Sequence, residues 1–297
     1  GGTQWTRRRL ITALLVAASA VVGLGVLFAE TIRREDDVAI IAHRGSSLVA
    51  PENTMAAVRQ SIKDGADWVE IDVQETADGE VVVFHDSDFM KMAGNPLKIW
   101  DATLEDLEAI DIGSWFDKKF KDERVPTLRQ VLQESQGRIG VLIELKYYGQ
   151  DVRLEKRVAE IVEAEGMQNE IEIMSLKAEA VTRMKALRPD WRVGFLMSLA
   201  TGDLSSINAD FLAVNASFVD HSFIRRAHRR DQSVLVWTVN DAVSMSSMIG
   251  KGVDGIITDV PDMGRLVLQQ RAQLNVAERL MLELAEIFGV RPQIVNQ

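Results

Sequence analysis

Cysteine is absent from the 297 residues of this sequence. Its absence excludes disulfide bonds, thiol nucleophiles and thiolate metal sites, but it does not decide the compartment in which the protein works. Net positive charge is lacking too, because 34 Lys and Arg face 44 Asp and Glu for a formal charge of −10. Nucleic acid is therefore not an expected partner, since proteins that bind it usually present a basic surface. Histidine is scarce, with four in the chain, so the position of each is informative.

One long apolar run lies near the start of the sequence, at residues 10–29 (LITALLVAASAVVGLGVLFA). It contains no charged residue, and its length at about 1.5 Å per residue matches the hydrocarbon thickness of a bilayer. The run predicts a transmembrane helix within an anchor and linker at residues 1–37. A secretory signal peptide is the competing interpretation, but its apolar core is shorter, at roughly 7 to 15 residues, and Leu27-Phe28-Ala29 is a poor cleavage site.

Arginines flank both ends of this run, three before it and two after it. By the positive-inside rule, the excess places the N-terminal side in the cytoplasm. We therefore expect a membrane protein whose larger part is extracytoplasmic. The sequence begins with Gly1 rather than Met, so we also expect that more protein preceded it.

Eight apolar, strand-like runs follow, and helix-like stretches separate most of them. Eight buried parallel strands alternating with helices predict an α/β fold of the TIM (β/α)8 barrel type over residues 38–271. A doubly wound open sheet gives the same alternation and is the alternative fold. Residues 272–297 predict a C-terminal helix and tail. The strand-like runs are at 38–43, 68–73, 139–146, 171–176, 192–197, 210–215, 234–239 and 254–259.

An extra strand (EVVVFH) follows the second run too closely for a helical crossover. Asp78-Gly79 lies between the two and is a turn signal, so they should form an antiparallel hairpin. A turn centred near positions 77 and 78 would pair Glu70 with His85. Residues 86–124 then form a long insertion that we expect to cover one end of the barrel.

Ionisable side chains interrupt the apolar runs at their C-terminal ends, although a buried strand excludes charges that have no partner. In a parallel barrel all of these ends point to the same rim, where active sites lie. We therefore expect a functional site at this rim. The residues are His43, Arg44, Glu70, Asp72, His85, Asp86, Glu144, Lys146 and Asp259.

Three of these residues are carboxylates from two neighbouring strands, Glu70, Asp72 and Glu144. Side chains alternate along a strand, so Glu70 and Asp72 share one face. The gathered negative charges would repel one another, and a divalent cation removes the repulsion. Oxygen ligands alone suit Mg²⁺ or Ca²⁺. Salt bridges with Arg44 and Lys146 are the alternative for any one of the three.

A cation, an arginine, a lysine and two histidines suit an anion that exchanges protons on both sides, such as a phosphodiester. Arg44 would hold phosphoryl oxygens in its planar fork, and Lys146 would add a point charge. Of His43 and His85, one would deprotonate the nucleophile and the other would protonate the leaving alkoxide. The sequence does not indicate which histidine does which.

Six motifs, in order along residues 40–265, resemble those of the glycerophosphodiester phosphodiesterase family: AHRGSSLVAPENT, VEIDVQETADGEVVVFHD, VPTLRQVL, IELK, VWTVN and GVDGIITDVP. The resemblance implies a TIM barrel that hydrolyses glycerophosphodiesters to sn-glycerol 3-phosphate and an alcohol with a divalent cation. It implies a catalytic pair, phosphate contacts, metal ligands and two further residues near the substrate. These are His43 and His85; Arg44 and Lys146; Glu70, Asp72 and Glu144; and Glu52 and Trp237.

The apolar run sets this sequence apart, because many members of that family are soluble. We expect a membrane-anchored member, and tethering favours a substrate derived from lipid. Lysophospholipase D activity on monoacyl phospholipids is an alternative with the same chemistry. A membrane-anchored module that binds phosphorylated ligands without catalysis is an alternative of another class. The sequence does not determine the oligomeric state.

Overall fold

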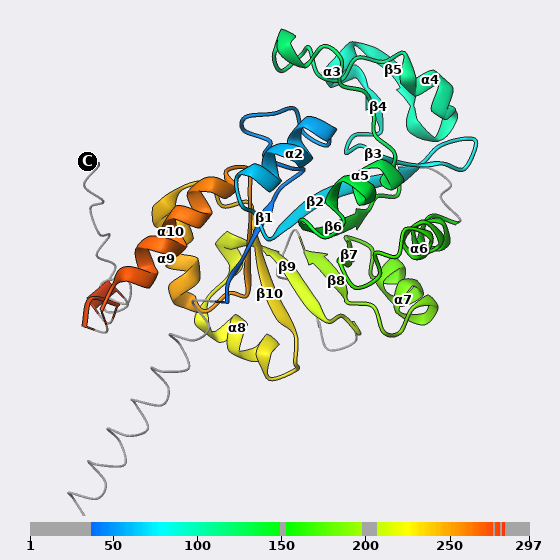
Figure 1. Cartoon of the computed structure of the whole chain (residues 1–297). Coiled ribbons are helices and arrows are strands. Elements are labelled where there is room, and N and C mark those ends of the chain that lie inside the picture. The colour runs from blue at the N-terminus through cyan, green and yellow to red at the C-terminus, as the bar shows by residue number, and fades with distance from the viewer. Residues whose placement is uncertain (1–36, 149–152, 198–206, 276, 280, 283–297) are drawn as a thin grey trace, which may run out of the picture.

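The computed structural model describes residues 37–148, 153–197, 207–275, 277–279 and 281–282 (Figure 1). The predicted transmembrane segment at 10–29 and most of the predicted tail at 272–297 lie outside these ranges. Within them, no helix combines the length and the apolar character needed to cross a membrane. The anchor at 1–37 and the other domain boundaries therefore stay predictions.

Eight parallel strands close into a barrel (Figure 1), in the order β1-β11-β10-β9-β8-β7-β6-β2. Because β1 also pairs with β2, the sheet has no open edge along this ring. The closure confirms the predicted TIM barrel and rules out the open sheet. The strands are β1 (Ala39–Ala42), β2 (Trp68–Glu75), β6 (Gly140–Leu145), β7 (Ile171–Ser175), β8 (Val193–Met197), β9 (Phe211–Asn215), β10 (Ser233–Trp237) and β11 (Gly255–Thr258).

Helices follow the strands and cover the outside of the barrel, as Figure 1 shows. Several begin at a residue whose side chain accepts a hydrogen bond from the first turn, such as Thr54, Thr127 and Asp241. These caps explain where the helices start. The helices are α2 (Met55–Lys63), α5 (Leu128–Ser135), α6 (Leu154–Ala164), α7 (Ala178–Leu187), α8 (His221–His228), α9 (Ala242–Lys251) and α10 (Pro261–Gln273), with a short 3₁₀ turn η4 (Ala216–Phe218) after β9.

An apolar cluster fills the inside of the barrel, separate from the layers between strands and helices. Its largest member is Phe211, which fits because Gly194 lies beside it: a Cβ at Gly194 would lie 2.0 Å from the Phe211 ring. Burying each large side chain stabilises the fold by about 1.5 to 3 kcal/mol. The inner cluster comprises Ile41, Leu142, Met174, Leu196, Phe211, Ala213, Leu235 and Ile257.

The predicted hairpin is present, but its register differs by one residue from the prediction. Strand β3 (Val81–Val83) pairs antiparallel with β2 so that Val73 faces Val83. The turn is a three-residue loop closed by the Thr76 N–H donating to the Glu80 carbonyl, with Gly79 at φ +83°. The turn therefore centres on position 78, and the predicted pairing of Glu70 with His85 does not form.

The predicted insertion at 86–124 forms a lobe beside the barrel, drawn in cyan to green in Figure 1. It has an apolar core with members such as Phe89, Ile99 and Leu107, and Val82 and Phe84 of the hairpin pack into the same core. A lobe with such a core can hold side chains in fixed positions at the barrel rim. Its elements are β4 (Asp88–Phe89), α3 (Met90–Ala93), β5 (Asn95–Lys98), η1 (Ile99–Asp101), α4 (Leu104–Glu108) and η2 (Lys118–Phe120).

Candidate active site

The polar residues of the predicted site form the next layer above the apolar inner cluster. Side chains two residues apart on a strand share a face. The residue two positions after a member of the inner cluster therefore also faces the barrel interior. Leu142 of the inner cluster is thus followed by Glu144 on β6. In the same way Ile41 is followed by His43, and Ile257 by Asp259. The barrel interior changes from apolar to charged toward the C-terminal ends of its strands.

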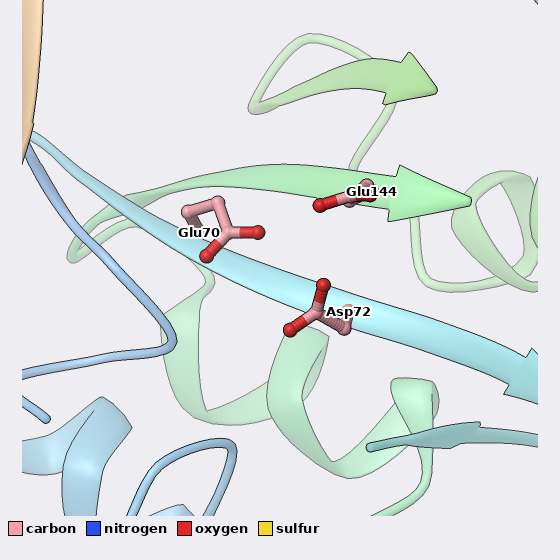
Figure 2. A group of neighbouring side chains, drawn as sticks. All are labelled: Glu70, Asp72 and Glu144. Atoms are coloured by element: carbon pink, nitrogen blue, oxygen red, sulfur yellow. The ribbon is translucent and has the colours of Figure 1, made fainter. Parts of the chain in front are cut away.

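Three buried carboxylates meet in this upper layer, as predicted. One oxygen each from Glu70, Asp72 and Glu144 lies within 4.8 Å of the other two. Figure 2 shows Glu70 and Asp72 on β2 and Glu144 on β6, with their carboxylates turned toward one another. Asp72 and Glu144 are direct neighbours across the parallel pair. Like charges opposite each other destabilise a sheet, so the arrangement requires positive charge nearby.

Two cationic side chains supply part of that charge. The Lys146 Nζ lies 3.1 Å from Asp72 Oδ1 and 2.8 Å from Glu144 Oε1, and the Arg44 Nε lies 3.3 Å from Asp72 Oδ2. The alternative reading of these residues, salt bridges with Arg44 and Lys146, therefore describes Asp72 and Glu144 correctly. Glu70 instead accepts a hydrogen bond from the Arg44 backbone N–H at 2.8 Å.

The pKa values show that this compensation is uneven. Burial and the charge of Asp72 raise the pKa of Glu70 to about 7. Burial and Asp72 also raise the pKa of Glu144. Burial would raise the pKa of Asp72 as well, but Lys146 and Arg44 hold it below its ordinary value. Two cations stabilise one carboxylate well and leave the other two short of positive charge.

The three carboxylates fit a hard divalent cation. Asp72 Oδ1 and Glu144 Oε1 are buried and accept no hydrogen bond from the described residues, although the Lys146 ammonium is close to both. Oxygen ligands are those that Mg²⁺ and Ca²⁺ prefer, at about 2.0 to 2.6 Å from the ion. Oxygens within 4.8 Å of one another can therefore share one ion. These distances between carboxylate oxygens fit both Mg²⁺ and Ca²⁺.

His43 lies at the end of β1 and is oriented by a carboxylate from the end of β11. Its Nδ1 is 2.7 Å from Asp259 Oδ1. Burial lowers the pKa of His43, but the hydrogen bond with Asp259 and the charge of Glu70 raise it above its ordinary value. Asp259 is itself held by Ser47 Oγ and Asn240 Nδ2, at 2.8 and 2.6 Å.

His85 lies at the end of the hairpin and has a similar partner. Its Nδ1 is 2.7 Å from Asp86 Oδ1. Burial lowers the pKa of His85, and the cation of Lys146 lowers it further although Asp72 opposes both. An ionised carboxylate only accepts hydrogen bonds, so Nδ1 is the donor in both histidines. Each imidazole therefore keeps Nε2 for proton transfer.

The loop after β1 adopts a backbone that few residues tolerate. Arg44 and Asn53 both have positive φ, at 53° and 57°. Gly45, at φ +82°, packs against α2 so closely that a Cβ would lie 2.5 Å from Ala57. Asn53 is held there because its Nδ2 donates to Asp72 Oδ2 at 2.8 Å. This constrained loop fixes the Arg44 side chain beside the carboxylates.

Comparisons with known proteins identify the family of this chain. Residues 43–263 match the model of the glycerophosphoryl diester phosphodiesterase family. A glycerophosphodiester phosphodiesterase of Caldanaerobacter subterraneus is 31% identical over 237 residues, which cover 75% of this chain and 94% of that protein. The YhdW protein of Bacillus subtilis is 34% identical over 230 residues, 75% of this chain and 95% of its own.

This chain belongs to the glycerophosphoryl diester phosphodiesterase family.

Solved structures of the family share the fold. A phosphodiesterase of Oleispira antarctica, in complex with its product sn-glycerol-3-phosphate, superposes with a TM-score of 0.74 at 28% identity and covers 78% of this chain and 96% of its own. A glycerophosphodiester phosphodiesterase of Agrobacterium tumefaciens gives a TM-score of 0.68 at 28% identity and covers 77% of this chain and 99% of its own. The family assignment thus agrees with the barrel fold.

Two further residues that the resemblance singles out lie at the edge of this family site. Glu52 accepts a hydrogen bond from Arg44 Nη1 at 2.9 Å and is not part of the carboxylate cluster. Trp237 ends β10 and packs on the inner cluster, and its buried Nε1 has no hydrogen-bond partner among the described residues. Glu52 therefore orients Arg44, and the role of Trp237 stays a prediction.

Sequence reasoning did not assign roles to three residues that orient this site: Asp259, Asp86 and Asn53. Asp259 was visible as a charged residue at a strand end, and Asp86 directly follows His85 in the sequence. Neither position indicates which imidazole the carboxylate contacts. Asn53 gave no signal, because only the fold reveals its positive φ and its contact with Asp72.

Proposed function

We propose that this protein hydrolyses glycerophosphodiesters to sn-glycerol 3-phosphate and an alcohol, with a divalent cation bound by Glu70, Asp72 and Glu144. The observation that carries the proposal is the meeting of these three buried carboxylates beside Arg44 and Lys146. The product bound to the Oleispira antarctica relative is the one that this reaction would release. Mg²⁺ and Ca²⁺ both suit the oxygen ligands.

In this proposal the charge of each group determines its role in the reaction. The cation would stabilise negative charge on the phosphoryl oxygens. Arg44 and Lys146 bind the phosphate through charge-assisted hydrogen bonds. His43 is the acid, because its hydrogen bond to Asp259 favours the imidazolium, and it gives its Nε2 proton to the leaving alcohol. His85, whose pKa is lowered, is the base that takes a proton from the nucleophile at Nε2.

The test is release of sn-glycerol 3-phosphate from glycerophosphocholine and glycerophosphoglycerol, with and without a chelator. We expect turnover that a chelator abolishes and that added Mg²⁺ or Ca²⁺ restores. Binding of substrate without any turnover would support a non-catalytic module instead. Turnover that survives both the chelator and His43→Ala would refute the assigned site.

A second candidate, lysophospholipase D activity, is supported by apolar side chains exposed near the catalytic rim. Several lie on loops that follow barrel strands or on the insertion, where they could contact an acyl chain. These are Leu48, Val49, Met90, Trp115, Tyr148, Leu176 and Phe218. Faster turnover of monoacyl than of deacylated phosphodiesters, reduced by Met90→Ser and not by Leu266→Ser on the outer helix α10, would support it. No turnover of monoacyl substrates would exclude it.

We also propose that residues 10–29 tether the catalytic domain to a membrane, on its extracytoplasmic side. The support is the uncharged length of this run and the arginines that flank it. Fractionation of cells that express the full chain tests the tether, since deletion of residues 10–29 should release the domain from the membrane fraction. Protease access to the domain in intact cells tests the side.

A further inference from the structure

We propose that Lys91 determines which alcohol group the enzyme accepts, by filling a cation site that would otherwise bind a positively charged alcohol such as choline. This inference rests on the proposed function and concerns the part of the substrate beyond the phosphate. It predicts a preference for glycerophosphodiesters with an uncharged alcohol over those with a quaternary ammonium group.

Lys91 belongs to α3 of the insertion and reaches across to the catalytic loop. Its Nζ donates to Glu52 Oε2 at 3.0 Å and lies 5.4 Å from the centre of the Trp115 ring. The Trp115 ring is fixed by its own Nε1, which donates to the Ile112 carbonyl at 2.7 Å, and by edge contact with Phe116. The lysine ammonium is thus bound by a carboxylate and an aromatic face.

A carboxylate next to an aromatic face is the chemistry that binds organic cations, and quaternary ammonium groups in particular. The carboxylate is in place without the lysine, because Glu52 is 12% exposed and its other oxygen accepts a hydrogen bond from Arg44. The Lys91 side chain is 49% exposed, so the position opens to solvent. The chain's own ammonium therefore occupies an accessible cation site.

The site lies beside the phosphate contact. Glu52 bridges Arg44 Nη1 and Lys91 Nζ through its two oxygens, at 2.9 and 3.0 Å. A substituent on a phosphate held by Arg44 can therefore reach Lys91. A choline group there meets a like charge and an occupied ring face, whereas the hydroxyls of a glycerol group can accept hydrogen bonds from the ammonium.

The experiment compares kcat/KM for glycerophosphocholine and glycerophosphoglycerol in the full chain and in Lys91→Met. We expect the choline-to-glycerol ratio to rise about fivefold or more in Lys91→Met, as loss of one repulsive charge and release of one cation–π face would produce. Methionine keeps roughly the length of the side chain, and Lys91 is exposed, so the variant should fold. Partial misfolding would lower both values of kcat/KM equally and would not change their ratio. An unchanged ratio would overturn the proposal.

Lys98→Met is the matched control. Lys98 is also an insertion lysine over an aromatic ring, 5.9 Å from the centre of Trp100, and it is paired with Asp88 rather than with Glu52. The ratio should not change in this variant. An equal change in Lys98→Met would mean that any lost insertion charge alters the preference, which would contradict a specific role of Lys91.

Titration with choline chloride tests the site without turnover. NMR of the indole N–H groups should show choline shifting the Trp115 signal in Lys91→Met but not in the unsubstituted chain, and Lys91→Met/Trp115→Leu identifies that signal by its absence. Equal shifts with and without Lys91 would overturn the proposal. If no variant hydrolyses either phosphodiester, the proposed function fails, while this titration still decides whether Lys91 fills a cation site.

Discussion

The two ends of the barrel interior both contain buried side chains but differ in chemistry. In the lower layer, Leu142 and Phe211 are 1% and 0% exposed and belong to the apolar inner cluster. In the layer above, Asp72 on β2 and Glu144 on β6 are 1% and 5% exposed and bear carboxyl groups. Burial of the lower layer stabilises the fold. Burial of the upper layer costs its charged groups their hydration, and their ion pairs compensate only part of that cost.

This contrast separates residues that maintain the fold from residues that do the chemistry. Substitutions in the lower layer should reduce stability and leave the reaction of folded molecules intact. Substitutions of reactive groups in the upper layer should reduce the reaction rate and leave the protein folded. The following predictions test that separation, starting with the largest effect.

His43→Ala and His85→Ala should each reduce kcat by about 10²- to 10⁴-fold, because each removes a proton-transfer group. Thermal unfolding should show that both variants remain folded. His221→Ala, at an exposed position on α8, is the control and should keep full activity. Retained activity in either of the first two variants would contradict the placement of the reaction in the upper layer.

Phe211→Ala should reduce the free energy of unfolding by about 3 to 5 kcal/mol, because it leaves a cavity in a fully packed cluster. Chemical denaturation measures the loss. The activity per folded molecule should stay within about twofold of the unsubstituted chain. If the fully folded variant showed a large loss of kcat, the lower layer would contribute to the reaction as well as to stability.

The protein without divalent cation should lose stability as the pH rises from about 4.5 to 7. Glu70 has an ordinary pKa of 4.5 and a pKa of about 7 in the fold, so the folded state retains a proton that the unfolded state releases. This contribution is complete below about pH 4.5 and is lost as the pH rises through 7, by roughly 1 to 3 kcal/mol. Denaturation in chelator at several pH values measures it.

Glu70→Gln should flatten this decline, since glutamine does not titrate. Added Mg²⁺ or Ca²⁺ should raise the stability of the unsubstituted chain above pH 7 and should have a smaller effect on Glu70→Gln. A decline that persists unchanged in Glu70→Gln would assign the effect to another carboxylate.

Asp259→Asn should reduce kcat by about tenfold, the smallest effect in the series, because it removes an orienting carboxylate and keeps the imidazole. The alkaline limb of the pH profile separates orientation from folding: His43 acts as the acid and should lose its proton at lower pH without Asp259, so activity should fall at lower pH on that limb. A profile identical to that of the unsubstituted chain would mean that Asp259 is structural only.

The sequence predicted the barrel and the members of its upper layer because both depend on local regularities. Alternation along a strand places Glu144 two positions above Leu142, and parallel strands bring their ends to one rim. The same reasoning failed at the hairpin, where Gly79 closes a three-residue loop and shifts the register by one. A turn type depends on backbone angles, which dipeptide signals describe only in part.

Contacts between distant parts of the chain could not be predicted in this way. The contact of Lys91 with Glu52 depends on how the insertion lies against the loop after β1, and the position of Lys91 over Trp115 depends on the fold of the insertion itself. The partner of His43 lies 216 residues away. No periodicity in the sequence connects such positions, so only the folded structure identifies them.

The 216 residues between His43 and Asp259 also determine when the site can form during translation. Strand β1 is among the first barrel elements to leave the ribosome, yet its neighbour β11 and the carboxylate that orients His43 are among the last. Nascent chains that extend past Glu144 but end before β11 therefore contain every proposed metal ligand but neither a closed ring nor the carboxylate that orients His43. We therefore expect hydrolysis only after translation of the barrel is complete, and polypeptides that end before β11 should be inactive because the ring cannot close.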